Sequence, residues 1–232
     1  MQPKASDALI VALDHDHAAP ALALVDALGD AVSFYKVGHP VVLGSETPCI
    51  RALLDRQKKV FLDYKFLDVE ETVMRSVAAA CKLGLTFITL HAYPKIMRAA
   101  ARARGDNSLK LLAVTVLTAL DQSDLDEMGI TMPLEELVIK RAKQAKAAGF
   151  DGIVASGREA AMVRAEVGPD FIIVTPGIRP AGTSVDDHKR PTTPASAIAN
   201  GANYLVVGRP IAEAKDPVAA ANRIIGEIAG AR

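Results

Sequence analysis

The chain of 232 residues contains no tryptophan and only two cysteines, Cys49 and Cys81. Two cysteines without a CxxC spacing exclude a disulfide-stapled scaffold and the common cysteine-based zinc sites. The longest apolar runs, such as Leu111 to Leu117, fall far short of the roughly 20 residues that cross a bilayer. Residues Met1 to Asp7 lack the charged and apolar regions of a signal peptide. We therefore expect a soluble, cytoplasmic protein with no membrane partner.

A net charge is also lacking, since 27 Lys and Arg residues balance 27 Asp and Glu residues. A neutral chain is a poor candidate for non-specific binding to nucleic acid, so we expect no nucleic-acid partner. Half of the residues are hydrophobic, which over this length is enough for a packed core. An anionic ligand would have to be bound by a local cluster of basic side chains.

Short apolar runs rich in strand-forming residues recur along the whole chain. They are Ala8–Leu13, Ser33–Val37, Lys59–Asp63, Thr86–His91, Leu109–Leu117, Gly152–Ala155, Phe171–Val174 and Asn203–Val207. Several are apolar at consecutive positions, as strands covered on both faces must be. Helix-forming stretches lie among them, including Ala18–Leu28, Glu71–Lys82, Lys95–Arg104, Pro133–Ala148 and Pro217–Ala229.

This alternation of strands and helices predicts a parallel sheet built from βαβ units. Repeated strand–helix units in a chain of about 250 residues are typical of a (β/α)8 barrel. No linker or change of composition divides the chain. We therefore predict an α/β fold with a single TIM-barrel domain over residues 1–232. An open, doubly wound sheet is the alternative, and the number of strands favours the barrel.

A barrel carries its chemistry at the carboxyl ends of the strands and in the loops that follow them. Polar or charged residues stand at that position after most of the predicted strands. They are Asp14, Lys36, Asp63, Lys65, His91, Thr118, Ser156, Arg179 and Arg209. The repeated placement predicts a polar site at one mouth of the barrel.

The densest group of charges is the segment from Asp63 to Asp68. Side chains alternate along a strand, so Asp63 and Lys65 should face the same way, and Lys36 can also point inward. A solvated surface cluster is the alternative, but the apolar residues before Asp63 favour an interior position. A lysine between carboxylates is stabilised as ammonium, which suits a proton donor or an electrostatic clamp and not a Schiff-base nucleophile. No set of side chains has the spacing of a metal site.

The loops after the last two predicted strands, Thr175–Arg179 and Val206–Ile211, have the features of a phosphate site. Barrels often bind phosphate at these two loops. Glycines let the backbone approach an anion, and Arg179 and Arg209 can add charge-assisted hydrogen bonds. Two surface arginines after glycine turns are the alternative. The long segment Pro180–Thr192 has the length of a lid or binding loop.

Seven motifs occur in a characteristic order along nearly the whole chain. They are Ala12-Leu-Asp14, Tyr35-Lys36-Val-Gly38, Asp63-x-Lys65-x-x-Asp68 followed by Thr72, Val116-Leu-Thr118, Thr175-Pro-Gly-Ile-Arg179, Thr193-Pro194 and Val206-Val-Gly-Arg209. The chain thereby resembles the orotidine 5'-phosphate decarboxylase family. The resemblance implies a (β/α)8 barrel that works as a homodimer, without metal or cofactor. The implied activity is the conversion of orotidine monophosphate to uridine monophosphate and CO2 in pyrimidine biosynthesis.

The resemblance also implies roles for individual residues. Lys65 would protonate C6 after CO2 leaves, and Lys36, Asp63 and Asp68 would complete the charged network. Asp68 and Thr72 would reach into the neighbouring subunit's site. The remaining implied substrate contacts are Asp14 and Lys36 at the ribose, Thr118 and Ser156 near the pyrimidine, and Arg179, His188, Gly208 and Arg209 at the phosphate.

The chain departs from the pattern of the family in three places. His188 stands where glutamine is usual, Leu67 where histidine is common, and Val69-Glu70-Glu71 where Ile-Pro-Asn is common. The histidine can still donate a hydrogen bond, and its charge would depend on pH. The two acidic residues suit the start of a helix or could change a dimer edge.

Two other functions compete with this one. A magnesium-dependent sugar-phosphate decarboxylase or aldolase of the same superfamily shares the Asp-x-Lys-x-x-Asp motif. It is expected to carry an acidic metal ligand where this chain has Lys36, whose charge would repel magnesium. A non-catalytic phosphate-binding barrel would explain Arg179 and Arg209 but not the convergence of charges on the second and third strands.

Overall fold

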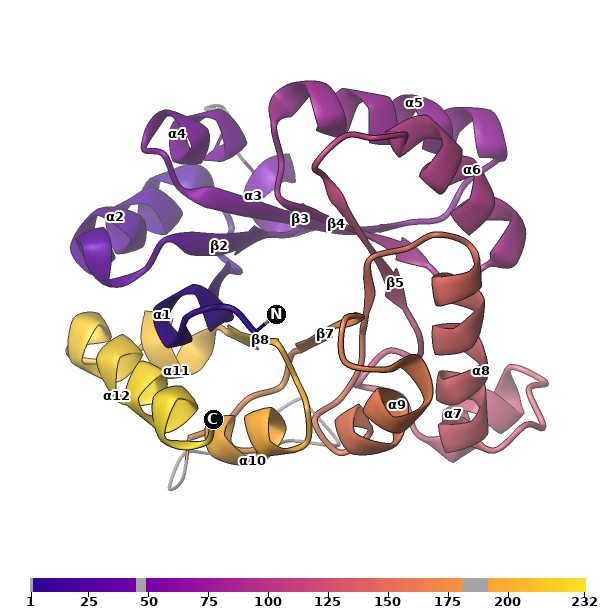
Figure 1. Cartoon of the computed structure of the whole chain (residues 1–232). Helices are drawn as coiled ribbons and strands as arrows, with labels where there is room; N and C mark the ends of the chain where they lie inside the picture. The colour runs from indigo at the N-terminus through magenta and orange to yellow at the C-terminus, as the bar shows by residue number, and fades with distance from the viewer. Residues whose placement is uncertain (1, 45–48, 181–191) are drawn as a thin grey trace.

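The structure, a computed structural model, describes residues 2–44, 49–180 and 192–232. Its strands form one closed barrel in chain order, and every neighbouring pair is parallel, including β1 with β8 (Figure 1). The strands are β1 (Leu9–Leu13), β2 (Phe34–Val37), β3 (Lys59–Phe66), β4 (Phe87–His91), β5 (Lys110–Val114), β6 (Gly152–Val154), β7 (Ile172–Thr175) and β8 (Tyr204–Val207). The predicted TIM barrel is confirmed.

The helices surround the barrel, with α5 and α6 outside β3 and β4 (Figure 1). The five predicted helices are α2 (Ala18–Leu28), α5 (Glu70–Leu83), α6 (Pro94–Arg104), α8 (Leu134–Ala147) and α12 (Pro217–Gly230), each within one residue of its predicted ends. The described chain also contains shorter helices, namely α1 (Ala5–Ala8), α3 (His39–Leu43), α4 (Cys49–Asp55), α7 (Gln122–Glu127), α9 (Ala160–Val167), α10 (Pro194–Ala199), α11 (Arg209–Ala212) and the 3-10 turn η1 (Gly29–Ala31). Among the described residues, no helix has both the length and the apolar character needed to cross a bilayer.

Two predicted strands differ from the observed ones by more than one residue at an end. The third strand continues past Asp63 to Phe66, so it includes Lys65. The fifth ends at Val114 and not at Leu117, because its pairing with β6 ends where Val114 meets Val154. The segment after Val114 therefore leaves the sheet at the mouth of the barrel.

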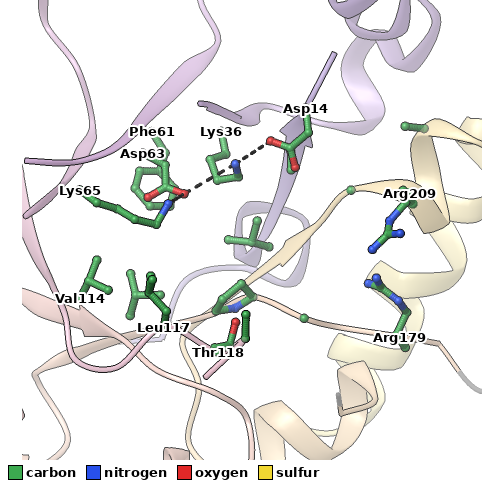
Figure 2. A pocket seen from close by; sticks show the side chains of 18 of the residues that line it. Asp14, Lys36, Phe61, Asp63, Lys65, Val114, Leu117, Thr118, Arg179 and Arg209 are labelled. Carbon is green, nitrogen blue, oxygen red and sulfur yellow. Dashed lines mark hydrogen bonds and ion pairs between the residues drawn. The ribbon is translucent and has the colours of Figure 1, made fainter. Parts of the chain in front are cut away.

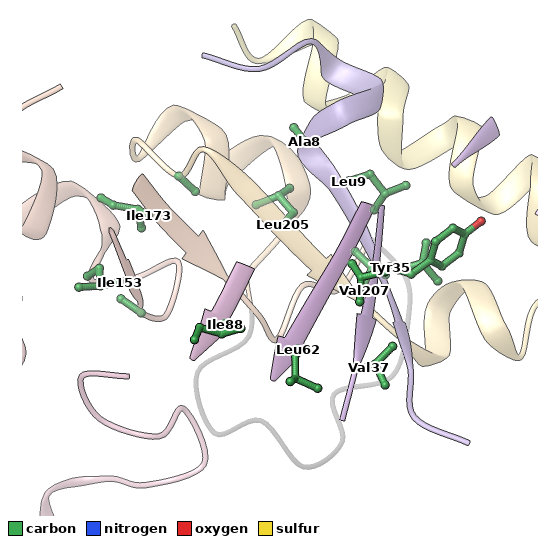
Figure 3. Packing of buried hydrophobic residues seen from close by; sticks show 14 of the residues in the cluster. Ala8, Leu9, Tyr35, Val37, Leu62, Ile88, Ile153, Ile173, Leu205 and Val207 are labelled. Carbon is green, nitrogen blue, oxygen red and sulfur yellow. The ribbon is translucent and has the colours of Figure 1, made fainter. Parts of the chain in front are cut away.

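The strands are apolar on both faces because each face packs against a different layer. One layer lies between the barrel and the helices, and Figure 3 shows part of it, with side chains from strands that include β1, β2, β7 and β8. The other layer fills the barrel, and consists of Ile10, Ala12, Phe34, Phe61, Phe87, Leu112, Val174 and Val206. Within it the rings of Phe34 and Phe61 pack edge-on against Phe87, with centroids 5.1 and 5.8 Å away.

This inner layer positions the polar residues above it. Side chains two residues apart on a strand share a face, so the residue two positions after each inner residue points into the barrel one layer higher. Asp14 follows Ala12 in this way, Lys36 follows Phe34 and Asp63 follows Phe61. The apolar layer thus closes the barrel below, and the charged residues form the floor of its mouth.

Candidate active site

A cavity of about 650 Å³ opens at the carboxyl ends of the strands. This volume is in the range of small-molecule sites. Its walls contain most of the residues predicted for the site, namely Asp14, Lys36, Asp63, Lys65, Thr118, Arg179, Gly208 and Arg209. The structure therefore brings together in one cavity the charged cluster and the arginine loops, which are far apart in the sequence (Figure 2).

One side of the cavity is a chain of alternating charges. The Lys36 ammonium donates to Asp14 Oδ1 at 2.8 Å and lies 3.6 Å from Asp63 Oδ2. The Lys65 ammonium donates to the same Asp63 oxygen at 2.9 Å (Figure 2). Two cations and two anions therefore balance one another.

Asp63 is the centre of this chain and is largely buried. Burial acts to raise its pKa, but the ammonium groups of Lys36 and Lys65 and hydrogen bonds from Lys65 and Thr89 act in the opposite direction. The net result is a pKa of Asp63 below its ordinary value. Asp63 is consequently an anion at neutral pH and can hold both lysines.

Lys65 has an unusual backbone. Its φ of 50° lies in the left-handed region, and Gln57 is the other non-glycine residue with a positive φ in the described chain. The pairing of β3 with β4 is irregular at the same point. The prediction that Asp63 and Lys65 face the same side is confirmed by the contact between their side chains, although regular strand alternation does not produce it.

The opposite end of the cavity carries two arginines. Figure 2 shows the guanidinium groups of Arg179 and Arg209 directed toward each other, from the segment after β7 and the start of α11. Gly208, which precedes Arg209, also lines the cavity, on the side of Asp14 and Ala12. Two guanidinium groups that line the same end of a cavity suit a phosphate group.

The lining between the two ends is mixed. Val114 and Leu117 lie near Lys65, and Thr118 lies between them and the arginines (Figure 2). A ligand that spans the cavity would thus place a phosphate at the arginines and a less polar ring beside Lys65. Phosphate and reacting carbon would be at opposite ends.

Asp68 and Thr72 do not line this cavity. They line a smaller depression of about 360 Å³ on the outside, with His39 and Tyr64 among its other walls. Asp68 there accepts a hydrogen bond from the Val69 amide at 2.6 Å. Lys65 lines both hollows, so within one chain it separates Asp68 from the rest of the charged network.

Two other predicted residues lie outside the cavity wall or the described chain. Ser156 is fully buried, and its amide donates to Glu159 Oε2 at 3.0 Å. Its side chain is therefore beneath the surface at the end of β6. His188, predicted at the phosphate, lies outside the described residues.

The acidic residues that depart from the family pattern have structural partners. Glu70 lies 3.0 Å from the Lys95 ammonium and 3.4 Å from Arg102 of α6, and Glu71 accepts from Arg75 at 2.9 Å. Glu70 therefore connects α5 to α6.

Sequence reasoning missed one neighbour of the cluster, Thr89, and named another, His91, only as a polar residue at the end of its strand. Thr89 is fully buried and contacts both Asp63 and Lys65 through its hydroxyl. His91, two residues along β4, has a pKa lowered by burial and by the positive charges of Lys65 and Arg141. The signal for both was their position: they follow Phe87 of the inner layer at intervals of two residues.

The described residues contain no group of three or more His, Cys, Asp or Glu side chains placed to bind a metal ion. The cavity carboxylates of Asp14 and Asp63 are instead bound to ammonium groups.

Comparison with known proteins shows the family of the chain. A sequence model of the orotidine 5'-phosphate decarboxylase / HUMPS family matches residues 7–224. Orotidine 5'-phosphate decarboxylase of Rhodopseudomonas palustris is 52% identical over 226 residues, covering 97% of this chain and 95% of the relative. That of Afipia carboxidovorans is 52% identical over 221 residues, covering 95% of this chain and 94% of the relative.

A solved structure extends the likeness to the fold. The crystal structure of orotidine 5'-phosphate decarboxylase from Lactobacillus acidophilus has a TM-score of 0.83 and 36% identity, and covers 98% of this chain and 99% of its own. The match in sequence and in three dimensions extends over the barrel and both ends of the cavity. The chain belongs to the orotidine 5'-phosphate decarboxylase / HUMPS family.

Proposed function

We propose that the cavity between Lys65 and the arginine pair is where this chain converts orotidine 5'-phosphate to uridine monophosphate and CO2. The activity is that of its relatives, which are about half identical in sequence. The observation that carries the assignment of the site is the ion-pair chain from Asp14 through Lys36 and Asp63 to Lys65. It fixes an ammonium group beside the space for the pyrimidine.

The chemistry needs a cation at the reacting carbon. When the bond from C6 to the carboxylate breaks, CO2 leaves and an electron pair stays on C6. The Lys65 ammonium stabilises this charge and then gives a proton to C6, and the resulting amine regains a proton from solvent. Asp63, which accepts from Lys65 Nζ at 2.9 Å, keeps the donor in place.

The other site residues bind the substrate. Asp14 and Lys36 hold the ribose hydroxyls, Thr118 and Ser156 support the pyrimidine, and Arg179, His188, Gly208 and Arg209 hold the phosphate. Phosphate binding far from C6 supplies energy for ordering the reacting end. Lys36 and Asp63 complete the charged network with Asp68 of a second subunit.

The partner arrangement is a homodimer with shared sites. Asp68 lies between two exposed apolar residues, Leu67 and Val69, which are 52% and 67% exposed. Exposed apolar side chains that flank a charged one suit an interface with a second copy. In that dimer Asp68 and Thr72 of one subunit reach the other's site.

Mixing two inactive variants tests the shared site. In a two-fold dimer, Lys65→Ala subunits combined with Asp68→Asn subunits give heterodimers with one intact site, so roughly a quarter of all sites regain activity. No recovery after verified subunit exchange would show that each site is built from one chain.

The competing magnesium-dependent activity is disfavoured by Lys36. Its ammonium lies between Asp14 and Asp63, the carboxylates that a magnesium ion in this cavity would need. We propose that the reaction needs no metal or cofactor. Purified protein in excess chelator should remove the absorbance of orotidine monophosphate at its full rate, and metal-dependent turnover of a sugar phosphate would overturn the assignment. The cytoplasmic location and the absence of nucleic-acid and membrane partners stay predictions.

A further inference from the structure

The strands β3 and β4 pair irregularly beside the cavity. The register runs from the pair Leu62 and Ile88 directly to the pair Phe66 and Leu90. Three residues of β3, Asp63 to Lys65, therefore lie opposite one residue of β4, Thr89. Extra residues in one strand interrupt the ladder and leave backbone groups to be bonded in another way.

The Thr89 hydroxyl bonds one of these backbone groups and, in addition, the Asp63 carboxylate. It donates to Asp63 Oδ1 at 2.8 Å and accepts from the Lys65 backbone N–H at 2.9 Å. One hydroxyl can do both, because it has one donor and two acceptor sites. The side chain of Thr89 is 0% exposed, so water does not compete for these bonds.

The two oxygens of Asp63 consequently have different partners. Oδ1 accepts from Thr89, and Oδ2 accepts from the Lys65 ammonium and faces Lys36. A carboxylate held at only one oxygen could rotate about its χ2 angle. The bond from Thr89 fixes that rotation, and it also braces the left-handed backbone at Lys65.

We propose that Thr89 is a positioning residue for the decarboxylation: its hydroxyl holds the bulge of β3 and the plane of the Asp63 carboxylate, so that the Lys65 ammonium points into the cavity. Thr89 does not line the cavity and acts only through these two residues. The inference depends on the role proposed for Lys65.

Two matched pairs of side chains isolate the hydroxyl. Threonine and Thr89→Val have nearly the same shape, and Thr89→Ser and Thr89→Ala differ by one oxygen atom. In each pair the variant without the hydroxyl leaves Asp63 Oδ1 and the Lys65 N–H without a buried partner. We expect kcat to fall roughly 10- to 100-fold within each pair, as when a reacting group is displaced.

The affinity for substrate and product should change little. The ribose and phosphate contacts proposed above do not involve Thr89, so KM and the Kd of uridine monophosphate should stay within about two-fold. Thr115→Val is the matched control, because Thr115 is also buried and its hydroxyl also joins two strands, donating to the Val154 carbonyl at 3.0 Å. Its kcat should equal that of the wild type.

The measurements are steady-state kinetics, product binding and thermal unfolding of all five proteins. The inference would be overturned if Thr89→Val or Thr89→Ala kept its full kcat. It would also be overturned if Thr89→Ser or Thr115→Val lost as much kcat as the hydroxyl-free variants. Hydroxyl-free variants that show no cooperative unfolding would overturn it as well, since the role would then be structural only. Failure of the proposed function is distinguishable, because the wild type itself would then not decarboxylate orotidine monophosphate.

Discussion

The two ends of the cavity are built from different parts of the fold. At the lysine end, Lys36 and Asp63 belong to strands β2 and β3, and their side chains are 12% and 13% exposed. At the arginine end, Arg179 follows β7 and Arg209 is the first residue of α11, so both stand on the connections after strands (Figure 2). Groups placed within strands are held by the sheet, whereas Arg179 lies beyond its strand and Arg209 begins a helix of only 4 residues. The lysine end is therefore suited to a reaction and the arginine end to binding.

The arrangement of the charges also differs between the two ends of the cavity. The lysine end alternates anion and cation, so each group fixes its neighbour. The arginine end places two cations side by side, an arrangement that attracts a multiply charged anion (Figure 2). Substitutions at the lysine end should lower kcat, whereas substitutions at the arginine end should mainly raise KM.

The largest effect is expected at Lys65. Lys65→Ala removes the residue proposed both as the proton donor and as the cation beside C6, so kcat should fall by at least about 10⁴-fold while uridine monophosphate still binds. Lys65→Arg keeps the charge but not a transferable proton, and should also be inactive. Steady-state kinetics and product binding check both variants, and Lys59→Ala, at the opposite end of β3, is the control. Normal turnover by Lys65→Ala would end the distinction between the two ends.

Asp63→Asn should have the next largest effect. It leaves the ammonium groups of Lys36 and Lys65 without their shared anion, and the two cations then repel each other. We expect kcat to fall roughly 10²- to 10³-fold, with a smaller change in KM. Asp26→Asn, the same chemical change at an exposed ion pair with Arg56, should leave kcat unaltered. A rise in KM alone would contradict the assignment of Asp63 to the reacting end.

At the arginine end, Arg179→Ala and Arg209→Ala should each raise KM roughly 10- to 100-fold, the value of a charge-assisted hydrogen bond to phosphate. The fall in kcat should be smaller than for Asp63→Asn. Inorganic phosphate serves as a probe: as a competitive inhibitor it should bind the wild type more tightly than either variant. Arg75→Ala, an exposed arginine on α5, is the control. Loss of kcat at unchanged KM would place these arginines in the reaction itself.

The lysine end was also the easier one to predict from sequence, up to a point. A strict interval of two residues above the inner apolar layer places Lys36 and Asp63 correctly, because strand alternation is a fixed geometric rule. The bulge at Lys65 and the contact of Thr89 were not predicted, because a change of register leaves no mark on the apolar pattern. Nothing in the composition of the segment reveals the left-handed backbone of Lys65, since lysine rarely adopts it.

The shorter helices and the place of Asp68 were unpredictable for a related reason. Helices such as α3 and α11 are too short to show a helical period, and tertiary contacts determine them. Asp68 follows the end of β3, so its direction depends on how the chain leaves the bulge. The resemblance to the family, and not the spacing, assigned Asp68 to the neighbouring subunit's site; in the single chain it lines the outer depression with Lys65.

The smallest effect we predict is a pH dependence of stability that belongs to the lysine end alone. The folded pKa of Asp63 lies below its ordinary value of 3.8. Its ionised form therefore stabilises the fold fully above that value, and this contribution is lost as the pH falls through the lower folded pKa. The free energy of unfolding in urea, measured at about pH 6 and about pH 3, should decrease more for the wild type than for Asp63→Asn. For Arg209→Ala this decrease should equal that of the wild type, because a guanidinium group does not titrate in this range. An equal decrease in the wild type and Asp63→Asn would mean that the lysines do not hold Asp63 as an anion. The contrast between the ion-paired lysine end and the arginine end would then fail.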